Sequence, residues 1–505
     1  MIEPGAVLEA LAAIMTPEIL PWIILGMAIG IMVGAVPGIG SVLGMSIVLP
    51  LTIPLSGLQA NILLVSIFSG AMYGSSISAI LLRVPGTAAA AATLLDGHPL
   101  TEKGLPKYAL AISATSSALG GGITILALLL LIPVLGSIVV LFGAPQIFLI
   151  AMFGILMIGV IASQGSFVKG VTAGLFGVLI MTIGISPASP GVRFTGGSLL
   201  LFDGLDYVAI LIGMFAIGEM IRLAAKPRGD NTTIVDGGSI VSGIGTTARN
   251  YVTMIKSGFI GMIIGAIPGA GSSASNFFAY AEAVRTAPLE EQESYGKGNP
   301  RGVVAAEASN NGTVAGSLMP VIAFGIPGSA ATAVLLGGFL LHGITPGPEL
   351  FDENLSFTYS LILALLIGNI FILIVGLSIV PYVGAAITRL DKDFIIPVVV
   401  VLATVGAFAL RANWVDIVTL LIFGLIAYLM YQYDYSIIAM VIGAVLANIL
   451  ETNLQRSLAL SDGSLLIFID DPVSVTIIVI MTLLMISPKL TAWYNSRTAS
   501  SNELE

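Results

Sequence analysis

The sequence predicts an all-α polytopic membrane protein. Of its 505 residues, 56% are hydrophobic and only 9% are charged, and the mean hydropathy is +1.04. Soluble globular chains carry about a quarter charged residues. Runs of about 20 apolar residues are long enough to cross a bilayer as helices. Long charge-free runs occur at 123–142, 357–378 and 473–487, and they are continuously apolar, which argues against a membrane β-barrel.

Along the chain we expect roughly 10 to 14 membrane segments, several of them interrupted. Residues 1–17 lack the basic region of a cleaved signal, so we expect the N-terminal residues to be retained. The polar stretch 222–256 has five basic and two acidic residues, which predicts a cytoplasmic position. A second polar loop, 285–302, reads as solvated surface. We therefore predict a first transmembrane repeat at 1–222, a central polar loop at 223–254, a second transmembrane repeat at 255–450, and a C-terminal membrane segment and tail at 451–505.

Two pairs of Pro-Gly motifs predict an internal duplication. GAVPGIGS at 34–41 reappears as GAIPGAGS at 265–272. In the same order, GSSISAILLRVPGTAAAA at 74–91 corresponds to GSLMPVIAFGIPGSAATA at 316–333. The first glycine and the Pro-Gly pair are 11 residues apart in both of these later motifs. One such match would be weak, but two ordered pairs with equal internal spacing indicate a repeat.

Proline and glycine break membrane helices, and a broken helix exposes two half-helix ends. The N-terminal end carries free N–H groups and suits an anion, whereas the carbonyl end suits Na⁺. Paired interruptions in two halves are the best pointer in a sequence to the binding site of a transporter. A single break more often serves helix packing or kinking, and each attached hydroxyl or amide can equally bond a neighbouring helix.

The duplication favours the binding interpretation, with both copies meeting near the middle of the membrane. The predicted substrate-binding residues are Pro37, Gly38, Gly40, Ser41, Ser75, Ser76, Arg83, Pro85, Gly86, Thr87, Pro268, Gly269, Gly271, Ser272, Ser273, Asn310, Asn311, Pro327, Gly328 and Ser329. Possible Na⁺ ligands are Gly38, Ser41, Thr87, Gly269, Ser272 and Thr332.

Arg83 follows an apolar run, where a guanidinium is costly unless it is paired or solvated. It could bind a substrate carboxylate through two parallel hydrogen bonds. It could equally extend to the membrane interface or pair with an acid. Both readings stay open.

Several function classes are disfavoured. The sequence has no cysteine and no HExxH motif, and it shows no cluster of intramembrane aspartates, so we expect no enzyme. The formal net charge of −9 gives no sign of a nucleic-acid partner. An ion channel would repeat its pore elements across subunits, whereas this repeat is internal. We expect no cofactor beyond a coupling ion, Na⁺ or H⁺.

The ordered motifs resemble the large membrane subunit of the tripartite tricarboxylate transporter family. The resemblance is carried by the Pro-Gly loops at 37–40, 85–87, 268–271 and 327–329, by the stretches 73–104, 169–187 and 300–338, and by Glu307–Asn311. It covers roughly residues 20–450. Arg83 departs from the family pattern, where a small or amide residue usually occupies this position.

The resemblance implies a carrier of the bacterial inner membrane that takes up di- or tricarboxylates or related carboxylates, driven by an ion gradient. It implies a small four-helix membrane subunit and a periplasmic solute-binding protein as partners. By analogy with other binding-protein-dependent carriers, an elevator-type movement is preferred. A stand-alone carboxylate carrier without a binding protein is the alternative.

Overall fold

The structure is a computed structural model that describes residues 3–37, 39–161, 167–186, 191–225, 237–267, 271–387 and 392–483. Between the connecting turns and loops, the regular elements of the described residues are helices and one pair of two-residue strands, which confirms the predicted all-α class. Within these described ranges, seven helices are long and apolar enough to cross a membrane, and eight further apolar helices have 10–17 residues. The protein is therefore a multi-pass membrane protein, while the exact number of segments stays a prediction.

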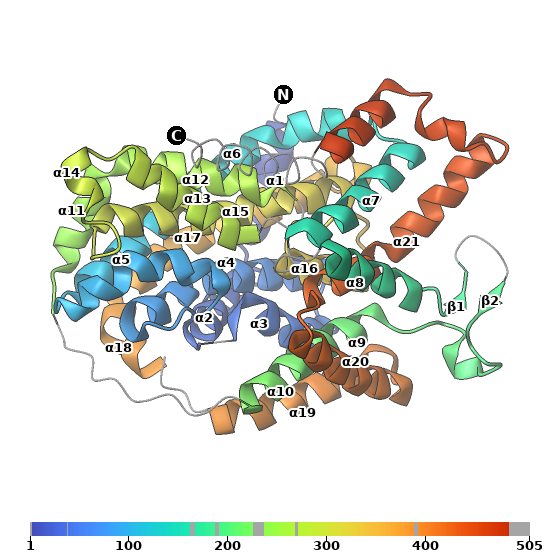
Figure 1. Cartoon of the computed structure of the whole chain (residues 1–505), viewed down its shortest axis with the longest axis horizontal. Helices are drawn as coiled ribbons and strands as arrows, with labels where there is room; N and C mark the ends of the chain where they lie inside the picture. The colour runs from blue at the N-terminus through green and yellow to red at the C-terminus, as the bar shows by residue number, and fades with distance from the viewer. Residues whose placement is uncertain are drawn as a thin grey trace, which may run out of the picture. The chain divides into compact units, whose positions relative to one another are not determined.

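The chain forms two compact units, each taken from two separate stretches of sequence. The first unit comprises Met1–Val139 and Leu205–Tyr433. Its elements are α1 (Pro4–Ile14), α2 (Leu20–Ala35), α3 (Gly40–Val48), η1 (Leu49–Thr52), α4 (Gly57–Leu82), η2 (Ala88–Ala90), α5 (Ala91–Glu102), α6 (Pro106–Val139), α9 (Tyr207–Ile212), η4 (Gly213–Ile217), α10 (Gly218–Ala225), α11 (Ile240–Arg249), α12 (Tyr251–Gly265), α13 (Gly271–Arg285), α14 (Leu289–Gln292), α15 (Pro300–Phe324), α16 (Ala330–Leu341), η5 (Pro348–Phe351), α17 (Leu355–Ser378), α18 (Val380–Ile387), α19 (Lys392–Arg411) and α20 (Trp414–Gln432) (Figure 1).

The second unit comprises Val140–Gly204 and Asp434–Glu505. Its elements are α7 (Ala144–Ile161), α8 (Phe167–Ile180), β1 (Gly184–Ile185), β2 (Val192–Arg193), η3 (Leu199–Leu201), α21 (Ile437–Leu460) and η6 (Leu465–Phe468). Because compact units and sequence repeats are different properties, the repeat boundaries predicted above stay a prediction.

Helix α4 lies in the core of the first unit. It begins with a capping box, in which Ser56 accepts a hydrogen bond from the Gln59 N–H and the Gln59 side chain bonds the Ser56 N–H. From Ala60 to Leu81 every residue is buried. A helix buried on all sides has no apolar stripe, which is why its sequence shows no amphipathic pattern.

Glycines bring two pairs of helices of this unit into backbone contact. Helix α2 packs on α4, and α12 packs on α15. A Cβ added at Gly30 would lie 2.5 Å from the Ile67 carbonyl oxygen, and one added at Gly261 would lie 2.2 Å from the Ser309 carbonyl oxygen. Contacts this short exclude side chains. Small residues of this kind are the usual means of close packing between membrane helices.

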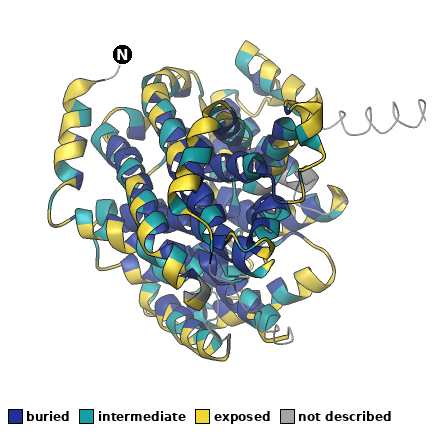
Figure 2. Ribbon diagram, turned by 90° about the vertical axis from the view of Figure 1, so that its left-hand side faces the viewer, coloured by how far each residue is buried: buried dark blue, intermediate teal, exposed yellow. Residues whose placement is uncertain are grey.

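The outer surface of the first unit carries apolar side chains at helical spacing. Ile370 and Ile374 on α17 are exposed, as are Val401 and Val405 on α19. Figure 2 shows this distribution, with buried residues inside the bundle and exposed residues on its outward faces. In water such stripes would favour aggregation. They fit a surface that faces lipid.

The second unit is built on a glycine contact and an ion pair. A Cβ at Gly443 of α21 would collide with the Gly174 carbonyl oxygen of α8. The hairpin formed by β1 and β2 is joined to α21 by Arg193, which donates to both carboxylate oxygens of Glu451 at 2.9 and 3.0 Å. Ser186 also donates to Glu451, at 2.8 Å.

Candidate functional site

Each Pro-Gly motif lies between two helices, and all four belong to the first unit. The breaks separate α2 from α3, α4 from η2, α12 from α13, and α15 from α16. The predicted helix interruptions are thus present wherever the structure describes them. Among the predicted site residues, Gly38, Pro268, Gly269 and the side chain of Ser273 lie outside the described residues.

The first and second breaks lie against each other. Gly40 begins α3 with φ of 68°, and a Cβ there would lie 2.9 Å from Cγ2 of Thr87. The Thr87 hydroxyl is buried and has no hydrogen-bond partner among the described residues. The Gly86 N–H donates to the Ser75 carbonyl at 3.2 Å, and a Cβ at Gly86 would lie 2.3 Å from the Gly34 carbonyl oxygen.

The fourth break has the same local geometry as the second. A Cβ at Gly328 would lie 3.0 Å from the Gly265 carbonyl oxygen and 3.2 Å from Cα of Ser317. Ser329 caps α16, since the Thr332 N–H donates to its hydroxyl at 3.3 Å. In return the Ser329 N–H donates to the Thr332 hydroxyl at 2.8 Å. The Thr332 hydroxyl also donates to the Ser329 carbonyl at 2.9 Å, so its proton and one of its two lone pairs are engaged in this capping box.

The glycine contacts recur at matching positions of the two copies. A residue of the first motif in the first copy corresponds to the residue 231 positions later in the second copy, as Gly34 does to Gly265. For the second motif the offset is 242 positions, as from Gly86 to Gly328. The matched pairs of glycine and contacted carbonyl are Gly30–Ile67 with Gly261–Ser309, Gly34–Ala71 with Gly265–Thr313, Gly70–Met27 with Gly312–Gly258, Gly74–Ile31 with Gly316–Met262, and Gly86–Gly34 with Gly328–Gly265.

Elements that follow a break in one copy contact elements that follow a break in the other. Helix α3 packs against α16, and η2 packs against α13. Asn276 on α13 donates to the Ala89 carbonyl at 3.0 Å and to Oδ1 of Asn310 at 3.2 Å. Asn310 in turn donates to the Met72 carbonyl at 2.8 Å. The two copies are therefore joined by buried amides next to the breaks.

The remaining predicted site residues lie in different environments. Ser75 donates to the Met72 carbonyl at 2.8 Å, so its hydroxyl is engaged within its own helix. Ser41 is buried, as are Gly86, Pro327 and Gly328, whereas Pro37, Pro85, Gly271, Ser272 and Ser329 are half-buried. Both amide atoms of Asn311 are buried without a partner among the described residues. Whether these groups bind substrate or Na⁺ stays a prediction.

Arg83 lies in exposed surroundings at the end of α4. Its side chain is 70% exposed, and Nη1 is 3.9 Å from Oε1 of Glu102. It occupies the left-handed C-cap position with φ of 59°, and the matching residue of the second copy, Gly325, has φ of 67°. The guanidinium is therefore exposed rather than buried, and it lies beyond the end of the apolar run. A role in binding carboxylate stays a prediction.

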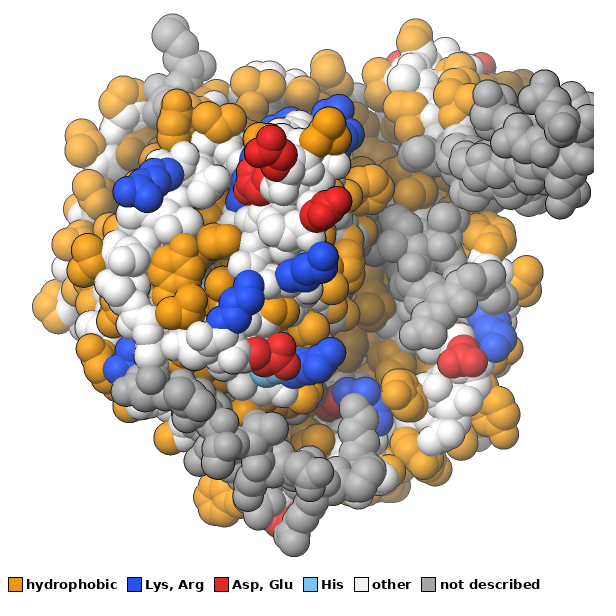
Figure 3. Space-filling view, turned by 60° about the vertical axis from the view of Figure 1, so that its left-hand side comes forward, with side chains coloured by type: hydrophobic (Ala, Val, Ile, Leu, Met, Phe, Trp, Pro, Cys, Tyr) orange, Lys and Arg blue, Asp and Glu red, His pale blue; other side chains and the backbone are white. Residues whose placement is uncertain are grey.

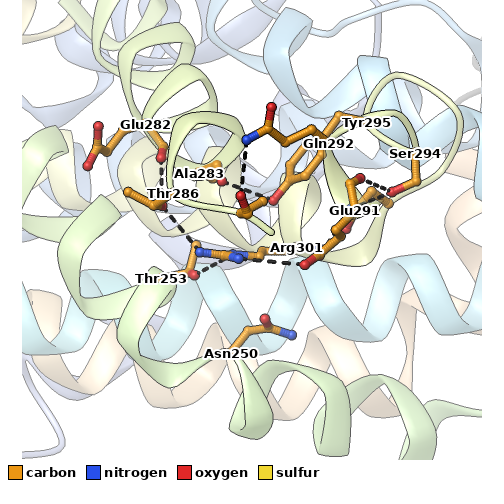
Figure 4. Close-up of polar contacts among 12 residues, drawn as sticks. Asn250, Thr253, Glu282, Ala283, Thr286, Glu291, Gln292, Ser294, Tyr295 and Arg301 are labelled. Atoms are coloured by element: carbon orange, nitrogen blue, oxygen red, sulfur yellow. Dashed lines mark hydrogen bonds and ion pairs between the residues drawn. The ribbon is translucent and has the colours of Figure 1, made fainter. Parts of the chain in front are cut away.

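The polar loop at 285–302 is pinned to its neighbours rather than freely solvated along its whole length. Arg301 donates to the hydroxyls of Thr253 at 2.9 Å and Thr286 at 3.2 Å, and Nη1 is 3.7 Å from the Glu291 carboxylate (Figure 4). Asn299 caps α15 and is only 4% exposed. This cluster fixes the beginning of α15 against α12 and α13.

Charged side chains gather on one face of the protein, with apolar side chains around them (Figure 3). At the end of α13, Glu282 accepts two hydrogen bonds from Arg285 at 2.7 and 2.9 Å and pairs with Lys256. These bonds, first from Arg285 and then from Lys256, lower the pKa of Glu282 to about 2. A group of such charges indicates a face in contact with water.

Glu307 is a buried acid whose role was not predicted beyond its place in the Glu307–Asn311 motif. It lies within α15 with an exposed fraction of 0%. Four hydroxyls donate to its carboxylate, from Ser76, Thr93, Ser113 and Ser117. Ser76, which was predicted to bind substrate, is thus committed to Glu307. The available signal was a lone acid within a long run of small and apolar residues.

Residues 20–442 match the tripartite tricarboxylate transporter TctA family. The chain belongs to this family. It is 29% identical over 472 residues to an uncharacterized 52.8 kDa protein in the TAR-I ttuC' 3' region of Agrobacterium vitis, covering 92% of both chains. A second protein of the same organism, from the TAR-II ttuC' 3' region, is 26% identical over 220 residues, which are 43% of this chain and 89% of that protein. No solved structure matches.

Membership of the tripartite tricarboxylate transporter family makes the protein a secondary transporter rather than an enzyme. Proteins of this family work with two partner proteins in tripartite transporters. The family match and the apolar helices agree on a membrane-embedded transport protein.

Proposed function

We propose that this chain is the carrier subunit of an importer for di- or tricarboxylates or related carboxylates in a bacterial inner membrane. An ion gradient, of Na⁺ or H⁺, drives uptake. A periplasmic solute-binding protein delivers the substrate, and a small four-helix membrane subunit completes the transporter.

The observation that carries this proposal is the contact between described parts of the breaks in one compact unit. Gly40 of the first break lies against Thr87 of the second, and the elements that follow the breaks of one copy contact those of the other. Irregular backbone inside a membrane is tolerated where protein or a water-filled cavity surrounds it. Here the breaks stand beside unpartnered or half-buried polar groups, of which the Thr87 hydroxyl is one. The N-terminal ends of α3, α13 and α16 follow three of the breaks and would offer N–H groups to a carboxylate.

We also propose that the two copies arose by duplication and move as a paired unit. The matched glycine contacts support this proposal, because unrelated helices have no reason to place close backbone contacts at constant offsets. An elevator-type slide of the paired unit is the preferred movement, by analogy with carriers built from broken-helix repeats.

Uptake of labelled carboxylates into proteoliposomes tests the proposal. The vesicles contain this chain and the small subunit, with or without the binding protein, under Na⁺ or H⁺ gradients. We expect uptake only with the binding protein, and we expect it to be lost in Pro85→Ala but kept in Gly122→Ala, since Gly122 has no atom within 4 Å of an added Cβ. Uptake without the binding protein would favour the stand-alone carrier. No carboxylate uptake under any gradient would refute the proposed substrate class.

A further inference from the structure

Glu307 is buried within α15, and no cation of the described residues contacts its carboxylate. Among the described residues it forms no ion pair, and its contacts are hydroxyls. Among the described charged and titratable groups on the helices packed against α15, none forms a hydrogen bond or ion pair with the Glu307 carboxylate. Those groups are Tyr73 on α4, Asp96, His98 and Glu102 on α5, Lys107 and Tyr108 on α6, Arg249 on α11, Tyr251 and Lys256 on α12, Tyr280, Glu282 and Arg285 on α13, Glu349 on η5, and Arg301 on α15 itself.

The other acids and bases nearby already have partners. Asp96 accepts hydrogen bonds from Tyr280 and from the N–H groups of Gly298 and Asn299, all at 2.7–2.8 Å. Lys256 pairs with Glu282. A buried carboxylate without a paired cation is costly when ionised. Glu307 therefore needs either strong hydrogen bonds or a mobile cation.

The four hydroxyls occupy both carboxylate oxygens. Oε1 accepts from Ser76 at 2.5 Å and from Thr93, while Oε2 accepts from Ser113 at 2.9 Å and Ser117 at 2.7 Å. An ionised carboxylate has about four acceptor positions, so this set saturates it. At these oxygen–oxygen distances the hydroxyls bond the carboxylate directly.

The same cage also accommodates the protonated acid. A hydroxyl rotates freely and can accept the carboxyl proton as readily as it donates. A serine within a helix can then turn its own proton to the carbonyl four residues earlier, as Ser113 and Ser117 on α6 are placed to do. Both protonation states of Glu307 are thus hydrogen-bonded after the rotation of one hydroxyl.

Unpartnered polar groups continue from Glu307 along one side of the core. Asn311 lies one turn further on the same face of α15, and neither of its amide atoms has a partner among the described residues. A Cβ at Gly121, one turn beyond Ser117, would lie 2.8 Å from both Cβ of Asn311 and Oδ1 of Asn369. Oδ1 of Asn369 and the Tyr73 hydroxyl are also buried without partners in the described chain. Such groups usually bind ordered water, which conducts protons.

Building on the proposed function, we propose that Glu307 is the proton-binding residue that couples the H⁺ gradient to carboxylate uptake. The carboxylate takes up one proton from the side of higher proton concentration, forming the neutral carboxylic acid. On the other side the acid releases that proton and returns to the carboxylate. The hydroxyl cage holds both forms, and the asparagines provide the hydrated route.

The test uses the reconstituted transporter with its partner proteins and a pH-sensitive dye inside the vesicles. We expect substrate addition to drive proton entry with the wild type and not with Glu307→Gln. Any exchange of labelled substrate that remains in Glu307→Gln should no longer depend on pH. Chromatographic profile and thermal unfolding of the variant show whether it has folded.

Two milder variants keep the inference testable if Glu307→Gln does not fold. Ser113→Ala and Ser117→Ala each remove one donor to the charged carboxylate, so the pH midpoint of uptake should rise by about one unit or more. Ser116→Ala is the matched control, because Ser116 is buried on the same helix but faces Thr247. Its midpoint should stay at the wild-type value.

The outcomes separate this inference from the proposed function. Wild-type carboxylate uptake with unchanged proton entry in Glu307→Gln would overturn the role of Glu307 and leave the carrier intact. Na⁺-dependent uptake without proton entry, abolished in Glu307→Gln, would overturn the assignment to H⁺. Absence of wild-type uptake under every gradient would instead refute the proposed function itself.

Discussion

The close contact at Gly86 gives a quantitative test of how tightly the second break is built. A Cβ added there would lie 2.3 Å from the Gly34 carbonyl oxygen and 2.8 Å from Cα of Ser75. Carbon and carbonyl oxygen normally approach to about 3.3 Å. Gly86→Ala would therefore force the loop and α2 apart by about 1 Å. Because both contacted groups are backbone, no side-chain rotation can relieve the overlap.

We expect Gly86→Ala to lower the free energy of unfolding by about 1–3 kcal/mol, the usual cost of overpacking. A displacement of about 1 Å also moves Pro85 and Thr87, so uptake should fall by about tenfold or more. The matching change, Gly328→Ala, meets the Gly265 carbonyl oxygen at 3.0 Å and needs a shift of only a few tenths of an ångström. It should cost about 1 kcal/mol or less.

Gly122→Ala is the control for both substitutions. Gly122 lies within α6 with no atom within 4 Å of an added Cβ, and alanine favours a helix by about 0.5–1 kcal/mol. The assays are thermal unfolding in detergent and labelled uptake in proteoliposomes. The reasoning is refuted if Gly86→Ala unfolds and transports like Gly122→Ala, or if Gly328→Ala is the more damaging change.

Three further predictions concern charged residues. Arg83→Gly should keep or raise thermal stability by up to about 1 kcal/mol, because glycine suits the left-handed cap; uptake lost without loss of stability would reveal a carboxylate-binding role, and unchanged uptake would exclude one. Glu282→Gln should lower the free energy of unfolding near pH 7 by about 0–1 kcal/mol. The bonds to Arg285 and Lys256 lower the pKa of Glu282 from 4.5 to about 2, so they stabilise the fold fully above pH 4.5. That difference should vanish as the pH falls through about 2, and a difference that grows in acid would contradict it. Arg301→Ala should cost about 1–3 kcal/mol through its lost hydrogen bonds, and Arg301→Lys should not restore the stability measured by thermal unfolding, because lysine cannot reach both hydroxyls at once.

The sequence was sufficient for the fold class and for the positions of the breaks. Long charge-free runs such as 357–378 appear as α17, and the Pro-Gly motifs separate helices where they are described. Both features are local, since apolarity and backbone freedom depend on a few neighbouring residues. The exposure of Arg83 could not be predicted from local sequence. An apolar run does not show that the residue following it, Arg83, lies beyond the end of α4 in a left-handed cap.

The environment of Glu307 could not be read from the sequence because its four donors come from three other helices. Ser76, Thr93, Ser113 and Ser117 lie 190–231 positions away along the chain. No spacing rule connects them with α15. The division into two compact units was equally hidden, since each unit joins stretches separated by other chain. Long-range packing, rather than local propensity, decides both features.

The buried acid and the matched breaks together explain why the two copies are not equivalent. Ser76, beside Ser75 in the first copy, donates to Glu307, whereas the matching position of the second copy is Leu318, which has no hydroxyl. All four donors to Glu307 therefore belong to the first half of the chain, and the acid belongs to the second. Any movement that separates α15 from α4, α5 and α6 would take the hydroxyl hydrogen-bond donors away from the ionised Glu307 carboxylate. The two halves should hence remain together during transport, which favours movement of the paired unit as one body over rocking of one half against the other.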